Sequence, residues 1–200
     1  MFPLGTVLLP GAHLALHVFE PRYRELVRVC LQGTPEFGVA LIERGTEVGG
    51  GDSRFRVGCV ARIVEAVPFD DGRWALGTVG VRRIRIERWL PDAPYPRAEV
   101  SDWDDPAPGA GALDDRRALV SKLRRVLALA AELGEPVPDA TVDLDEDPVL
   151  AGYQVAALAP LGPMDRLAAL GAPTPDDRAR LLSGLLDDAA MVLAARVAGG

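Results

Sequence analysis

The chain has 200 residues, a formal net charge of −7 and 48% apolar residues, which is the composition of an ordinary globular protein. An acidic chain lacks the basic surface that supplies most nonspecific affinity for nucleic acids, so we expect no nucleic-acid partner. No run approaches the ~18 consecutive apolar residues of a membrane helix. The N-terminus is a poor secretory signal, because it has no lysine or arginine before His13 and is interrupted by Pro3 and Pro10. The composition therefore predicts a cytoplasmic protein that engages no membrane and keeps Cys30 and Cys59 as buried free thiols.

The first hundred residues show the pattern of short strands joined by turns, with one helix. Apolar residues alternate with others from Leu14 to Phe19, which predicts a strand. Pro21 then suits the first position of a helix that Gly33 ends. Asp71-Gly72 predicts a hairpin turn, Gly58 is a candidate bulge, and residues 44–56, with three glycines at 49–51, form a loop. Further strands are expected at Thr6–Leu9, Phe37–Glu43, Val57–Val67, Trp74–Val81, Arg83–Leu90 and Arg97–Trp103.

The second half of the chain has helical patterns only. A Pro-, Gly- and Asp-rich linker at 106–111 separates a β domain at 1–105 from a helical domain at 112–200. Asp147 and Thr174 are good N-caps, each followed by a proline. Four helices are expected, at residues 114–133, 148–159, 163–171 and 175–197, and we interpret them as a bundle.

The N-terminal run of motifs resembles the opening of the substrate-binding domain of Lon proteases. Phe2-Pro3-Leu4, Pro10-Gly11 and Phe19-Glu20-Pro21-Arg22-Tyr23 match its pattern in order. Pieces farther along are also similar, namely Phe37-Gly38-Val39, Gly58-Cys59-Val60-Ala61, Gly80-Val81-Arg82-Arg83 and Tyr95-Pro96-Arg97-Ala98-Glu99-Val100.

The resemblance implies an α+β protein with an N-terminal PUA-like pseudo-β-barrel that carries one helix, followed by a C-terminal four-helix bundle. It also implies non-covalent recognition of polypeptide, either unfolded segments or a partner protein such as protease machinery. Such a site needs exposed apolar surface or an open strand edge and no catalytic groups or cofactor.

The residues that catalysis would need are scarce. The only lysine, Lys122, lies in no phosphate-binding G-x-x-x-x-G-K-[ST] loop, so we expect no ATPase. Its neighbour Ser121 cannot face it on a helix, and Ser183 lies inside the last helix, so we expect no serine–lysine peptidase. His13 and His17 would lie about 13 Å apart on one strand, too far to share a metal ion. The sequence therefore predicts no enzyme and no metal site.

Six residues are candidates for contact with a peptide. The aromatic side chains of Phe69, Trp74, Trp89 and Trp103 could form an apolar binding surface, although core packing would explain them as well. Glu20 and Arg22 at the corner before the helix could extend it. In the alternative interpretation, Glu20 caps the helix, Arg22 pairs locally and the nearby Tyr23 packs in the core.

Two other function classes stay open. A small hydrolase or transferase would need a compact cleft with perturbed titratable groups, which one sequence does not reveal. An RNA-binding module would use the arginine-rich strand with Arg82, Arg83, Arg85 and Arg88.

Overall fold

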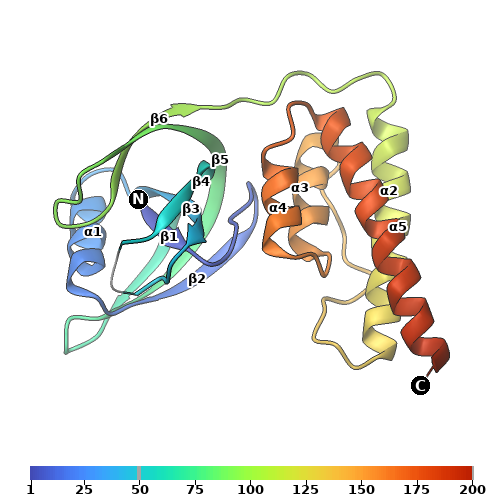
Figure 1. Ribbon diagram of the computed structural model, residues 1–200, viewed down its shortest axis with the longest axis horizontal. Coiled ribbons are helices and arrows are strands. Elements are labelled where there is room, and N and C mark those ends of the chain that lie inside the picture. The colour runs from blue at the N-terminus through green and yellow to red at the C-terminus, as the bar shows by residue number, and fades with distance from the viewer. Residues whose placement is uncertain (49–50, 200) are drawn as a thin grey trace. The chain divides into compact units, whose positions relative to one another are not determined.

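The computed structural model describes residues 1–48 and 51–199, so Gly49 and Gly50 of the glycine run, and Gly200, lie outside the described residues. The chain divides into two compact units, Met1–Asp104 and Asp105–Gly200, the first built on a sheet and the second on helices (Figure 1). Among the described residues, no helix combines the length and the apolar character needed to cross a membrane.

The first unit contains one sheet of six described strands. Their order is β1-β3-β4-β5-β2, and β6 pairs with β5 beside that path. β1 is parallel to β3, and every other pairing is antiparallel. The strands are β1 (Phe2–Leu4), β2 (His13–Val18), β3 (Glu36–Arg44), β4 (Ser53–Pro68), β5 (Trp74–Leu90) and β6 (Arg97–Asp102).

β5 is one long strand where the sequence predicted two. Pairing with β4 continues from Trp74 to Arg85, with a register shift between Gly80 and Arg82, so the polar run around Arg82 and Arg83 does not end the strand. The other edge of β5 pairs first with β2 and then with β6. The change of partner follows Gly80, whose N–H donates to Ala12 O and whose carbonyl accepts from Gly11 N.

The predicted strand at Thr6–Leu9 is wrong. The first strand is Phe2–Leu4 instead, and the backbone of Leu9 turns, with its carbonyl accepting from Ala12 N. That carbonyl lies against Gly80, where a Cβ atom would come within 2.2 Å of it. Leu8 and Leu9 are buried without belonging to a strand, which explains why their apolar pattern was misleading.

α1 (Pro21–Gln32) packs its buried residues Tyr23, Leu26, Val27 and Cys30 into the core of this unit. Pro21 occupies the first turn and Gly33 is the C-cap, as the sequence predicted. The turn between β4 and β5 is also confirmed, because Phe69 and Gly72 donate backbone hydrogen bonds across it. Cys30 and Cys59 are buried free thiols.

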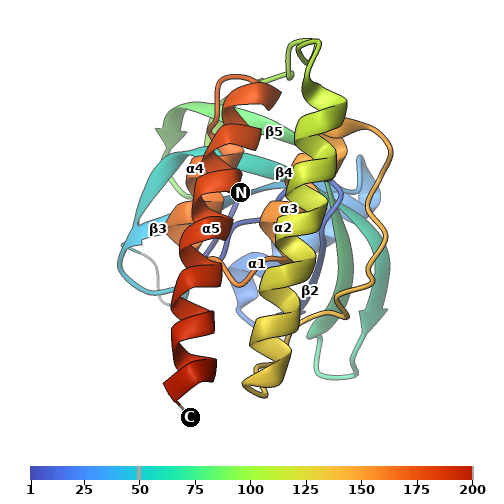
Figure 2. The same ribbon diagram turned by 90° about the vertical axis from the view of Figure 1, so that its right-hand side faces the viewer.

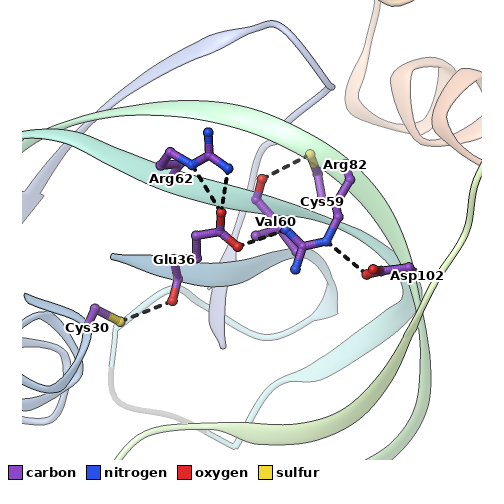
Figure 3. Close-up of polar contacts among 7 residues, drawn as sticks. All are labelled: Cys30, Glu36, Cys59, Val60, Arg62, Arg82 and Asp102. Carbon is purple, nitrogen blue, oxygen red and sulfur yellow. Dashed lines mark hydrogen bonds and ion pairs between the residues drawn. The ribbon is translucent and has the colours of Figure 1, made fainter. Parts of the chain in front are cut away.

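A chain of ion pairs connects four strands of the sheet (Figure 3). Glu36 on β3 accepts from Arg62 on β4 at 2.9 Å and from Arg82 on β5 at 2.8 Å. Arg82 also pairs with Asp102 on β6 at 2.9 Å. The Glu36 side chain is 15% exposed, and its hydrogen bonds to Arg82 and Arg62 lower the pKa of the carboxyl. This network therefore holds the strands in register as long as Glu36 is ionised.

The second unit consists of α2 (Ala112–Glu132), α3 (Pro148–Leu158), α4 (Pro163–Leu170) and α5 (Pro175–Gly199). α2 and α5 lie side by side in both views and run in the same direction (Figures 1 and 2). The predicted caps form, because Asp147 accepts from Val149 N and the hydroxyl of Thr174 accepts from Asp177 N.

A buried arginine connects three elements of the helical unit. Arg178 on α5 is 1% exposed and stacks 3.8 Å from the ring centre of Tyr153 on α3. Its guanidinium donates to the hydroxyl of Tyr153, to the carboxylate of Asp105 and to the carbonyl of Ala169. Because a buried guanidinium is costly without partners, these contacts fix α5 against α3 and α4.

Gly58 has a packing role that predicts the effect of a substitution. A Cβ atom there would lie 2.4 Å from Val39 O on β3, and the β3–β4 register shifts between Arg54 and Gly58. We expect Gly58→Ala to lower the free energy of unfolding of the β unit by about 1–3 kcal/mol. Tryptophan emission during denaturation measures it, because all three tryptophans lie in this unit.

Gly184 on α5 provides the matched control, since a Cβ there would meet no described atom within 4 Å apart from its chain neighbours and the backbone of its own helix. Gly184→Ala should leave the unfolding transition seen by tryptophan emission unchanged. It should raise the free energy of unfolding of the helical unit, measured by circular dichroism, by about 0.5–1 kcal/mol. An unchanged tryptophan midpoint in Gly58→Ala would contradict the close approach.

The Glu36 network predicts an acid-dependent stability. A carboxyl whose folded pKa is lowered contributes stability above its unfolded pKa, near 4.5, and loses it as the pH falls through the folded value. Glu36→Gln should therefore lower stability by about 1 kcal/mol at pH 7. The difference from the unchanged protein should shrink below about pH 4 in denaturation curves recorded from pH 7 to 3. A difference that is constant with pH would contradict the ion-pair role.

Candidate functional site

A pocket lies where the strand β2 turns into α1. We call it the corner pocket, and it encloses about 160 Å³. An apolar cavity of about 150 Å³ holds a molecule such as benzene, so this one accommodates a single apolar side chain. Its walls are Phe2 and Leu4 of β1, residues 15–18 of β2 with the following Phe19, the N-cap residue Glu20, Tyr23 of α1, and the loop residues Glu47 and Val48.

The floor of the pocket is rigid and aromatic. Phe2 stacks on Tyr23 with ring centres 4.1 Å apart and an angle of 9° between the planes. Burial raises the pKa of the Tyr23 hydroxyl to about 12, so the phenol stays neutral at physiological pH. Because both rings belong to the core of the unit, the pocket is already formed without a ligand.

The rim of the pocket exposes aromatic side chains. Phe19 is 48% exposed and Phe69, from the β4–β5 turn, is 43% exposed. Between them lies His17, with ring centres 6.2 Å from Phe19 and 5.8 Å from Phe69. Val67 on β4, also exposed, lies two positions before Phe69. These four residues, which we call the aromatic rim, form an apolar surface next to the pocket.

Arg22 positions the acidic groups around the pocket. Its Nε lies 3.1 Å from the Glu20 carboxylate, and its guanidinium also donates to the carbonyl of Glu47 at 3.4 Å. The carboxylate of Glu47 accepts from Gly5 N. As in the alternative interpretation, Glu20 is the N-cap residue of α1 and Tyr23 packs in the core. The cap uses the Glu20 carbonyl, which accepts from the first turn, while the carboxylate pairs with Arg22.

The predicted aromatic candidates lie in different places. Phe69 belongs to the aromatic rim, whereas Trp74 is half-buried against the core and faces Pro21 and Arg24. Trp89 lies under the guanidinium of Arg54 at 4.7 Å. Trp103 lies 4.1 Å and 3.9 Å from the guanidinium carbons of Arg83 and Arg85. Of the six candidates, Glu20 lines the corner pocket, Arg22 pairs with Glu20, and Phe69 contacts His17 at the rim. The three tryptophans do not line the pocket.

The arginine-rich part of β5 is matched by carboxylates. Arg82 pairs with Glu36 and Asp102, and Arg88 pairs with Glu99. The Arg83 guanidinium donates to Trp103 O. Because phosphate binding requires a net positive surface, these pairings disfavour the RNA-binding alternative.

A serine–lysine contact does occur, between residues that the sequence did not pair. Lys122 Nζ on α2 donates to the hydroxyl of Ser183 on α5 at 2.7 Å, and also to the carboxylate of Asp187 at 2.5 Å. Lys122 is thus shared between the Ser183 hydroxyl and the Asp187 carboxylate. The contact joins the two long helices.

The corner pocket has the chemistry of a binding site. Among the described residues, no group of three histidine, cysteine or acidic side chains is placed to hold a metal ion. Burial raises the pKa of Cys59 to about 12, so that thiol is not a nucleophile at neutral pH. What the pocket offers is an apolar cavity, an aromatic rim and two carboxylates.

Sequence reasoning missed Phe19, His17, Val48 and the β1 side chains. Ala15, His17 and Phe19 occupy alternate positions and are exposed, whereas Val18 between them is buried. The alternation alone could therefore have predicted that His17 and Phe19 are exposed. Val48 and the contribution of Phe2 and Leu4 depend on contacts across the fold and left no local signal.

Comparison with known proteins gives consistent results. The family model for the ATP-dependent protease La (LON) substrate-binding domain matches residues 1–188. The crystal structure of a Lon N-terminal domain protein from Xanthomonas campestris is 31% identical, with a TM-score of 0.61, and covers 93% of this chain and 95% of that one. The N-terminal domain of the Mycobacterium avium complex Lon protease has the same fold, with a TM-score of 0.64, 15% identity and the same coverage of both chains.

Two complete proteases are also similar to the chain. Lon protease 2 of Myxococcus xanthus is 25% identical over 150 residues, which are 74% of this chain and 18% of that protein. Lon protease of Cytophaga hutchinsonii is 32% identical over 98 residues, 48% of this chain and 12% of that protein. The chain thus spans less than a fifth of these relatives. Because the family model covers almost all of it, the chain belongs to the LON substrate-binding domain family.

Proposed function

We propose that the chain recognises polypeptide, as unfolded segments or as part of a partner protein, through the corner pocket and the aromatic rim. The observation that carries this proposal is the pairing of a preformed apolar pocket with exposed Phe19 and Phe69 beside it. Exposed aromatic side chains next to a pocket are typical of protein-binding surfaces. The family to which the chain belongs supports a substrate-binding role.

The proposal includes the finer form of the fold and the absence of catalysis. In it, the sheet and α1 form a PUA-like pseudo-barrel, α2 to α5 form a four-helix bundle, and the described residues act without ATPase or peptidase chemistry. The salt-bridged Lys122 and the neutral thiols support this, since none provides an activated nucleophile. Any protease that would receive the bound polypeptide belongs to the same proposal.

Binding to an array of unstructured peptides, measured by fluorescence anisotropy with folded proteins as controls, tests the function. We expect micromolar affinity for apolar peptides. Phe19→Ser and Phe69→Ser should each weaken it by about 1–2 kcal/mol, or roughly five- to thirtyfold in Kd, because each removes apolar contact area. Both residues are half-exposed, so neither change should affect folding.

Val100→Ser is the matched control, because Val100 on β6 is also 44% exposed but lies outside the pocket and the rim. It should bind as the unchanged protein does. Equal affinity in all four proteins would sink the assignment to this surface, and no binding across the array would sink polypeptide recognition itself.

A further inference from the structure

The corner pocket touches β2 in an unusual way. Five consecutive residues, 15–19, line it, although successive side chains of a strand point to opposite faces of the sheet. A pocket above one face would meet only alternate residues. The pocket therefore runs along the edge of β2, where the backbone itself is accessible.

The hydrogen-bond pattern shows which backbone groups this edge presents. Gly80 N donates to Ala12 O, and the carbonyl of Leu14 faces β5, where it accepts from the hydroxyl of Thr78. Because hydrogen-bonded and non-hydrogen-bonded pairs alternate in an antiparallel ladder, the N–H and C=O of His13, Ala15 and His17 point away from β5. β2 pairs with no other described strand, so this row of donors and acceptors lies on its outer edge, where Ala15 and His17 line the corner pocket.

We propose that a polypeptide binds by adding an extended strand to this edge of β2, an inference that rests on the proposed function and specifies its mode. The backbone of the bound segment exchanges hydrogen bonds with His13, Ala15 and His17, and one apolar side chain enters the corner pocket. Strand addition reads backbone rather than sequence, so it suits unfolded segments of many sequences.

Charge identifies the occupant further. The residues that line the pocket include Glu20 and Glu47 and neither lysine nor arginine. Arg22 neutralises Glu20, which leaves the exposed Glu47 without a cation from the lining. A segment with a basic residue beside its apolar side chains is therefore complementary to the site, and an acidic segment is not.

The test uses an eight-residue peptide of alternating leucine and serine with an arginine at each end, and two versions that are N-methylated at one or the other set of alternate residues. N-methylation removes backbone donors and adds bulk at that edge. Strand addition predicts that one version loses at least tenfold in affinity while the other binds as the parent does, because only one edge of the bound strand faces β2. Equal affinities for both versions would overturn it.

A variant of the protein gives an independent readout. Ala15→Pro removes an N–H that faces away from β5, so β2 keeps its ladder, and edge strands tolerate proline there. We expect roughly fivefold weaker binding, since one hydrogen bond is lost, whereas Ala15→Ser, which keeps the N–H, should bind normally. Wild-type affinity in a folded Ala15→Pro protein would overturn the proposal, while the N-methylated pair decides the matter if that variant does not fold.

The outcomes separate this inference from the proposed function. If no array peptide binds, both fail. Two outcomes overturn strand addition alone, provided that array peptides bind and their binding depends on Phe19. In the first, the alternating peptide does not bind; in the second, both N-methylated versions bind equally. If sedimentation shows a dimer that Ala15→Pro converts to a monomer, a second copy of the chain occupies the edge, and the proposal for a polypeptide ligand is overturned.

Discussion

The backbone pairing of β5 is the constraint on which the rest of the β unit depends. One edge of this strand is bonded to β4, and its other edge is divided between β2 and β6. The division follows Gly80, which alone can lie so close to the carbonyl of Leu9. β2 is therefore the last strand of its path, with its outer edge toward the corner pocket. β5 contributes no residue to the pocket, but its choice of partners fixes where the candidate site lies.

The local signals of the sequence predicted the elements well where chemistry acts over a few residues. Pro21 and Gly33 bound α1, Asp147 and Thr174 cap α3 and α5, and Asp71-Gly72 forms the turn before β5. The failures are non-local. Leu8 and Leu9 are apolar and buried outside any strand. β5 continues through Arg82 and Arg83 because the carboxylates of Glu36 and Asp102 and the carbonyl of Trp103 accept from their guanidinium groups.

The candidate site was predictable only in part for the same reason. Glu20, Arg22 and Phe69 could be selected because they lie at a corner and a turn, which are the places where side chains leave the core. The tryptophans were equally reasonable by residue type, but their surroundings depend on arginines far away in sequence, such as Arg54 beside Trp89. The sequence pattern shows which residues are apolar, but only the fold shows which of them contact one another.

The parallel arrangement of α2 and α5 has a consequence for how the helical unit forms. Helices joined by a short loop are antiparallel, whereas Lys122 on α2 contacts Asp187 and Ser183 on α5, which are 65 and 61 positions away in the sequence. Before they can pair, the chain must close the long loop that holds α3 and α4. The pairing of α2 with α5 is therefore non-local although both elements are helices, and we expect this loop closure to slow the folding of the unit.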